Sequence, residues 1–170
     1  MSARHLAEIS TTLLLDYIQN NIEAALGKVS IDRADNLVSL EKPKSYFYYS
    51  NIKGLQLPAI IAIAEDIDFR KKEKQANFIN AIIRTNVVCL VEDIDTKKLQ
   101  LKAWRYQAAL HEILDQAEIE NSAKTVKDII VITSARFSPT YTESDNPNDG
   151  RSIFRKEALL ELEINHYEKL

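Results

Sequence analysis

The sequence contains little glycine, a single cysteine and no long apolar run, and each shortage excludes a class of protein. With 3 glycines in 170 residues, the chain has neither a phosphate-binding P-loop nor a dinucleotide fingerprint. The single cysteine, Cys89, rules out an internal disulfide and gives no support to a zinc site. Because Cys89 lies in the apolar run NVVCLV, we expect a small buried residue and not a reactive thiol.

Charge and hydropathy also restrict where the chain acts. No stretch approaches the roughly 18 apolar residues of a membrane span, and the start MSARHLAEIS lacks the apolar core of a signal peptide. We therefore expect no membrane association and a chain that is made and assembled in a reducing cytoplasm. The formal net charge is −3, so no broad cationic field attracts nucleic acid. The length predicts a single domain over residues 1–170.

The spacing of apolar residues predicts two long helices and five strands. The first helix covers residues 4–27, with Gly27 as its C-cap, and residues 28–45 are expected to be irregular. Asp95 is expected to cap the N-terminus of the second helix, residues 96–117. Strands are expected at residues 45–50, 58–66, 78–92, 126–137 and 153–168.

The order of these elements is α-β-β-β-α-β-β, which predicts an α+β fold. In this fold an antiparallel β-sheet carries both long α-helices, and the hairpin 58–66/78–92 lies at its centre. The link between the two strands of the hairpin is too short for a parallel crossover, which needs about a dozen residues. We therefore expect the two strands to be antiparallel.

Two EDID segments, residues 65–68 and 92–95, suggest a metal-dependent nuclease site at first sight. A cation needs several oxygens within one coordination shell, so both segments would have to converge. In an antiparallel hairpin the first segment lies beside the turn and the second at the far end of the partner strand. The predicted geometry separates them, and we interpret both as solvated strand ends without a metal.

Other chemical signatures fail in the same way. The segment DNPNDG imitates a calcium loop, but Pro147 stands where an oxygen ligand is needed and Lys156 where the bidentate glutamate belongs. His5, His111 and His166 have no metal-ligand spacing. A nucleophile triad stays open, since its members converge only in space, although no G-x-S-x-G elbow occurs. We expect no catalytic residues, no metal and no cofactor, and hence no enzyme.

The layout of the chain resembles a family of phage proteins. A leading helix is followed by LPAIIAIAEDID, a long strand ending VVCLVEDID, the helix LQLKAWRYQAALHEIL, then IIVITSARFSP, a polar loop and ALLELEI. This layout, over residues 5–168, resembles the tail terminator (tail completion) and neck proteins of long-tailed phages, although residues 28–45 have no counterpart. The resemblance implies a non-enzymatic virion protein of the tail or neck, assembled in the host cytoplasm.

The same resemblance implies the partners. Copies of the chain would form a homo-oligomeric ring, commonly a hexamer, that caps the tail tube and joins the tail to the head. Its neighbours would be the tail tube or a sheath protein and a head-completion or connector protein, and DNA would pass through without specific binding. The alternatives are another phage assembly component, such as a head-completion or minor tail protein, a small nucleic-acid-binding protein, or an enzyme.

The polar segment SPTYTESDNPNDG, residues 138–150, is long for a hairpin loop, which usually needs 2 to 5 residues. We interpret this loop as an arm that lies on a neighbouring subunit; the alternative is a merely flexible hairpin tip. Deleting residues 141–149 is expected to leave the protomer folded and to weaken assembly. The candidate subunit interface is Phe78, Ile82, Arg84, Tyr141, Glu143, Asp145 and Asp149.

Overall fold

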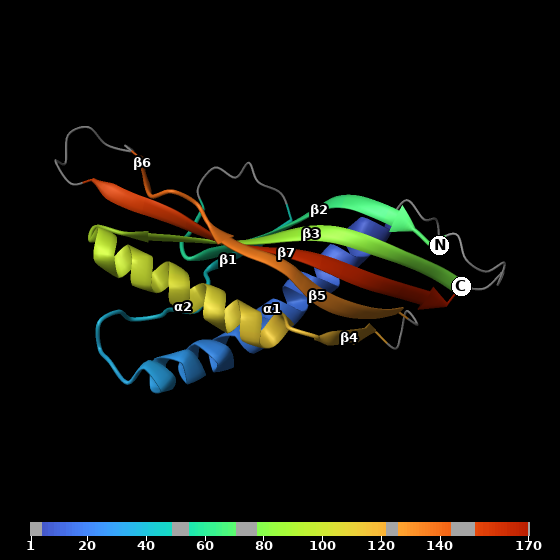
Figure 1. Ribbon diagram of the computed structural model, residues 1–170, viewed down its shortest axis with the longest axis horizontal. Coiled ribbons are helices and arrows are strands. Elements are labelled where there is room, and N and C mark those ends of the chain that lie inside the picture. The colour runs from blue at the N-terminus through green and yellow to red at the C-terminus, as the bar shows by residue number, and fades with distance from the viewer. Residues whose placement is uncertain (1–4, 49–54, 71–77, 122–125, 144–151, 170) are drawn as a thin grey trace.

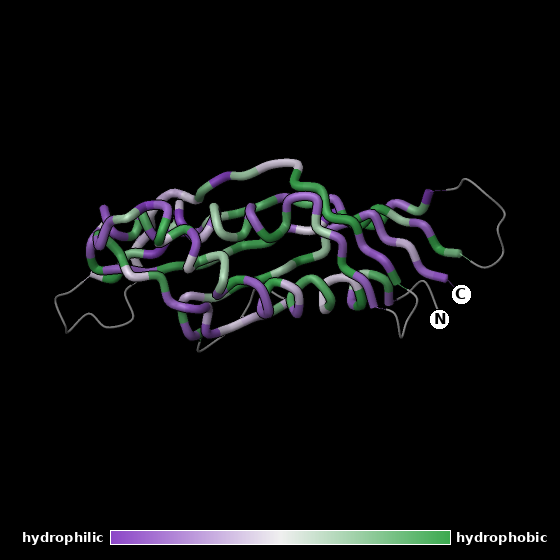
Figure 2. Tube along the Cα trace, turned by 90° about the horizontal axis from the view of Figure 1, so that it is seen from below, coloured by the Kyte–Doolittle hydropathy of each residue, from purple (hydrophilic) through white to green (hydrophobic). Residues whose placement is uncertain are grey.

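Long strands follow the long axis of the molecule, and two helices lie against one face of the sheet that they form (Figures 1 and 2). The computed structural model describes residues 5–48, 55–70, 78–121, 126–143 and 152–169. The elements in chain order are α1 (Leu6–Arg33), β1 (Ser45–Phe47), β2 (Ala59–Phe69), β3 (Phe78–Asp93), α2 (Thr96–Leu114), β4 (Glu118–Asn121), β5 (Val126–Phe137), β6 (Tyr141–Glu143) and β7 (Ile153–Lys169).

The strands form one sheet in the order β1-β2-β3-β7-β5-β4, and β6 extends this sheet by pairing with β7. The predicted β2/β3 hairpin is confirmed as antiparallel. The centre of the sheet is the β3/β7 pair, whose register runs from Phe78↔Lys169 to Asp93↔Phe154. Strand β7 also pairs antiparallel with β5. The α+β class and the packing of both helices on the sheet are therefore confirmed.

Three details of the predicted fold are wrong. The hairpin does not lie at the centre of the sheet, because β2 is next to the edge strand β1 whereas β3 and β7 are central. Strand β1 is parallel to β2, so the sheet is mixed and not wholly antiparallel. The observed order is α-β-β-β-α-β-β-β-β, because two short strands, β4 and β6, were not predicted. Strand β4 has 4 residues and β6 has 3 residues, too few for alternation to reveal a strand. Only their pairing with longer neighbours, β5 and β7, makes them strands.

The first helix does not end at Gly27 as predicted but continues to Arg33. Val29 and Leu26 are buried three residues apart on the same helix face, so packing extends the helix past the glycine. The helix ends instead at Ala34, whose left-handed backbone (φ 48°) lets its amide donate to the carbonyl oxygens of Ser30 and Ile31. The predicted N-cap of α2 is confirmed, since Asp95 accepts from the amides of Lys97 and Lys98.

The core lies between the two helices and the sheet face that they cover. Alternate residues of the central strands point into it, and Cys89 is fully buried there as predicted. Burial raises the pKa of the Cys89 thiol far above its ordinary value. No described helix is long and apolar enough to cross a membrane. The largest buried side chains are Leu6, Leu14, Ile18, Ile22, Ile60, Ile83, Leu99, Tyr106, Leu110, Leu114, Ile130 and Leu160.

The segment after α1, predicted to be irregular, is held in place by α2. Arg105 is almost fully buried, and its Nη2 lies 2.6 Å from both carboxylate oxygens of Asp35. The hydrogen bond from Arg105 lowers the pKa of Asp35. The hydroxyl of Tyr106 donates to the backbone carbonyl of Glu41. Trp104 on α2 is 50% exposed and so is not part of the core.

Candidate assembly surface

One face of the sheet is left uncovered by the described helices, because α1 and α2 contact each other on the opposite face. We call it the open face. Along β7, every second residue from Lys156 to Glu168 is buried against the helices, and the alternate residues lie on the open face at intermediate exposure. Because directly paired residues share a face of a sheet, the register places the corresponding residues of β2, β3 and β5 on the open face too.

Ion pairs between neighbouring strands cross the open face. Arg84 on β3 stands between two carboxylates, with Nη1 2.6 Å from Asp66 Oδ2 on β2 and Nε 3.6 Å from Glu163 Oε1 on β7. Arg136 on β5 lies 2.7 Å from Glu161 on β7. Such half-exposed pairs contribute only about 0–1 kcal/mol each. Their main effect is to hold the charged side chains of neighbouring strands in rows across the sheet.

The five predicted interface residues that the structure describes lie at opposite ends of the sheet. Phe78, Ile82 and Arg84 are alternate residues of β3 and share the open face near one end, where Phe78 is 55% exposed. Tyr141 and Glu143 belong to β6, which pairs with the first residues of β7 at the other end. In the register of β7, Phe78 and Tyr141 are separated by 14 residues, or roughly 46 Å. The structure therefore brings the first three together and not all five.

Asp145 and Asp149 lie outside the described residues, as does most of the predicted arm. The arm begins as strand β6, so residues 141–143 are part of the sheet and not of a free loop. Tyr141 is 40% exposed, and its hydroxyl donates to Glu157 Oε1 at 3.3 Å. Burial and the neighbouring charge of Glu157 raise the pKa of Tyr141. Tyr141 and Ile153 give this end of the sheet an exposed apolar surface.

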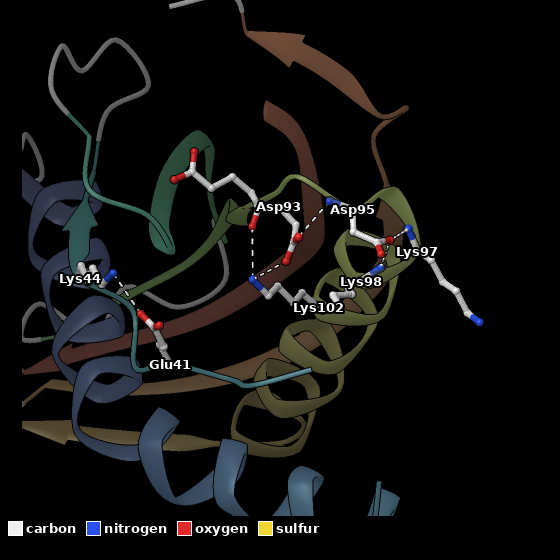
Figure 3. Close-up of polar contacts among 8 residues, drawn as sticks. Glu41, Lys44, Asp93, Asp95, Lys97, Lys98 and Lys102 are labelled. Atoms are coloured by element: carbon white, nitrogen blue, oxygen red, sulfur yellow. Dashed lines mark hydrogen bonds and ion pairs between the residues drawn. The ribbon is translucent and has the colours of Figure 1, made fainter. Parts of the chain in front are cut away.

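The acidic segment after β3 serves the local fold (Figure 3). Asp93 lies 2.8 Å from Lys102 Nζ of α2, and its Oδ1 accepts from the amide of Asp95. Burial alone would raise the pKa of Asp93, but hydrogen bonds from Lys102 and from the Asp95 amide lower it below its ordinary value. Asp95 itself caps α2. Both acids are therefore committed to the helix start, and among the described residues no group of His, Cys, Asp and Glu is arranged to hold a metal ion.

The two EDID segments diverge as the hairpin predicts. Asp66 pairs with Arg84 near the turn of the hairpin, whereas Asp93 lies nine residues further along β3, roughly 30 Å away. A shallow pocket of about 210 Å³ opens beside the second segment. Polar groups that line the pocket form ion pairs with one another, as Glu41 and Lys44 do at 3.0 Å. The pocket is lined by Ser39, Glu41, Lys44, Leu57, Pro58, Val91, Glu92, Lys102 and Tyr106.

A buried polar cluster joins the start of α1 to the sheet. Asp128 on β5 accepts from the hydroxyl of Ser10 at 2.8 Å and lies 2.6 Å from His166 Nδ1 on β7. His166 Nε2 is 3.9 Å from Glu168 Oε2, and all four residues are at most 3% exposed. In a nucleophile triad the histidine stands between serine and acid, so that it can take the proton. Here the acid stands between them, which makes this arrangement a structural cluster.

The sequence interpretation missed this cluster, although a signal for it was present. His166 and Glu168 continue the alternation of Leu160, Leu162 and Ile164, so their positions already predict that they face the helices. Asp128 has the same relation to Ile130. A run of polar residues on the core-facing side of a strand indicates a buried network, and His166 was considered only as a metal ligand.

Comparison with known proteins adds no family. No protein-family model matches the sequence, and no curated protein gives a significant match. Among solved structures, a chain described as "Virion of native gene transfer agent (GTA) particle" is similar to 87% of this chain and 94% of its own length, at 12% identity and a TM-score of 0.31. A TM-score of this size does not establish a common fold. The function is therefore argued from the chain's own geometry.

Proposed function

We propose that this chain is a structural protein of a phage-like virion, in which copies assemble into a closed ring at the end of the tail tube. The observation that carries the proposal is the sheet, whose open face no described helix covers. Phe78, Tyr141 and Ile153 are exposed at the ends of the sheet, and gathered exposed apolar side chains favour contact with other subunits. The ring would cap the tail tube and join the tail to the head, with six copies as the expected number.

The length of the strands supports an assembly role. Strands β3 and β7 have 16 and 17 residues, or roughly 50–55 Å, whereas strands in globular proteins are usually about 5–6 residues long. Helices α1 and α2 have 28 and 19 residues, or roughly 42 and 28 Å, and the helix-facing side of β7 is buried from Lys156 to Glu168. The opposite side of the same long strands has no described helix over it. Surfaces of this kind are suited to contacts between rigid protein subunits.

The two ends of the sheet provide two separate contact regions. At one end, Phe78 and Tyr167 are exposed, with Ile82 beside them on the open face. At the other end lie Tyr141 and Ile153. A ring that joins two different structures needs two such regions, one toward the tail tube and one toward the connector. The net charge of −3 per copy suits DNA passage, because carboxylates repel phosphates.

The state of assembly in solution tests this proposal. The full chain would be purified, and its mass measured by light scattering after size exclusion, alone and with a phage tail-tube protein. We expect a single closed oligomer, alone or on the end of tubes whose length it limits. A chain that stays monomeric in both conditions, and that is missing from purified particles, would contradict the proposal.

A further inference from the structure

Two edges of the sheet present unpaired backbone. Strand β1 pairs with β2 only at Ala59, Ile60 and Ile61, so within the described chain no strand borders the outer side of residues 62–69. Strand β4 pairs with β5 only over Val126–Ile129, and in the same described part nothing pairs with the outer side of residues 131–137. Such edges are templates for another strand, and natural proteins usually cover them.

Several side chains along both edges are exposed. On β2, Glu65, Asp66 and Asp68 are exposed. On β5, Ala135 and Arg136 are exposed. Each edge also carries a β-bulge, between Ala64 and Asp66 on β2 and between Ile132 and Ser134 on β5. Beyond the bulges, a short regular segment remains on each strand.

The charges at the two edges are complementary. The exposed edge of β2 carries three carboxylates, at Glu65, Asp66 and Asp68, and no cation. The exposed edge of β5 carries one charge, the cation Arg136. Like charges directly opposed across two strands are destabilising. Pairing of β2 with a second β2 is therefore disfavoured, and the favoured partner of a β2 edge is a β5 edge.

The directions of the strands fit the same pairing. Strands β2, β3, β7 and β5 are successively antiparallel, so β2 and β5 run in opposite directions. If neighbouring copies are related by a rotation about an axis along the strands, β2 of one copy lies antiparallel to β5 of the next. This contact is heterologous, because it joins two different edges. Repeated around an axis it closes into a ring.

We propose that the sheet edges of neighbouring copies pair in this way, β2 with β5, and so build the ring as one continuous sheet. The pairing rests on the proposed function. Asp66 would lie opposite the partner subunit's Arg136, and Asp68 opposite the partner subunit's Ser134. This register keeps open-face residues opposite open-face residues and lies between the two bulges.

The proposed register also continues the ion pairs of the open face. Within one copy the row reads Glu163, Arg84, Asp66, and the last of these stands at the β2 edge. The β5 edge begins with Arg136, which is paired with Glu161. Joining the edges places Arg136 of one copy after Asp66 of the other. The charges then alternate across the subunit boundary as they do within the sheet.

Cysteine cross-linking tests the pairing. Cys89 is buried and serves as an unreactive background. The variant carrying Asp68→Cys and Ser134→Cys in one chain is treated with a short bis-maleimide, and the products are separated by mass under denaturing conditions. We expect a ladder of covalent oligomers that ends at the ring size. Each single variant alone gives no ladder, and a mixture of the two single variants gives covalent dimers only.

A matched control combines Ser134→Cys with Asp16→Cys, an exposed position on α1. This pair lies on different layers and is expected to give no ladder. If the Asp68/Ser134 variant assembles to the wild-type mass without a ladder, edge pairing is overturned while the proposed function stands. If the wild-type chain forms no oligomer, alone or with tail tubes, the proposed function is overturned as well.

Discussion

Removing the carboxylate of Asp128 should destabilise the fold strongly, because it anchors the buried cluster between α1 and the sheet. In Asp128→Ala, the hydroxyl of Ser10 and the Nδ1 of His166 lose their acceptor while both residues are 0% exposed. Leaving two buried polar groups without a partner costs about 1–3 kcal/mol for each of them. Asp128→Asn keeps the shape and can still accept from one neighbour and donate to the other. Its cost should be smaller, about 1–3 kcal/mol.

Urea unfolding followed by circular dichroism measures these costs as changes in the free energy of unfolding. Asp16→Ala is the matched control, since Asp16 is exposed on the helix that carries Ser10, and it should change stability by no more than about 0.5 kcal/mol. The slope with urea should stay the same in all variants, because the folded state is retained. A loss below about 1 kcal/mol in Asp128→Ala would show that the cluster does not hold α1 to the sheet.

Three further changes separate local stability from assembly. Gly27→Ala should stabilise the protomer by up to about 1 kcal/mol in thermal unfolding, because an added Cβ meets nothing within 4 Å in the middle of a helix; a destabilised variant would contradict the helical role. Tyr141→Ala, which removes the hydroxyl bonded to Glu157, should leave unfolding within about 1 kcal/mol and weaken attachment to tails in a reconstitution assay. The lowered pKa of Asp93 beside Lys102 contributes stability that is present above its ordinary value of 3.8 and is lost as pH falls through the lower folded value. Asp93→Asn should therefore flatten the acid side of the stability profile, and an unchanged profile would refute this.

The sequence allowed the elements to be located because each central element has one buried face. Alternation over Leu160, Leu162 and Ile164 identified β7, and the link after β2 was short enough to require a hairpin. The N-cap at Asp95 followed from local hydrogen bonding alone. Features that depend on three to four neighbouring residues could thus be predicted from the sequence.

The pairing of distant strands could not be predicted from the sequence, since periodicity does not show which strand lies beside which. Strand β7 is inserted between β3 and β5, and β1 joins β2 in parallel. The positions of the predicted interface residues relative to one another depend on this strand pairing, so the sequence did not reveal them. Phe78 and Tyr141 were both assigned to the subunit interface, and the register of β7 places them at opposite ends of the sheet. Gly27 was predicted to end the first helix, but the helix continues past it because Val29 packs into the core.

Electron microscopy of the purified full chain tests the central claim most directly. Class averages of negatively stained particles should show closed rings of one size with rotational symmetry and a central opening. Rings with six-fold symmetry would agree with the expected number of copies. Monomers, two-fold dimers or open filaments as the only species, with and without tail tubes present, would contradict a ring-forming structural role.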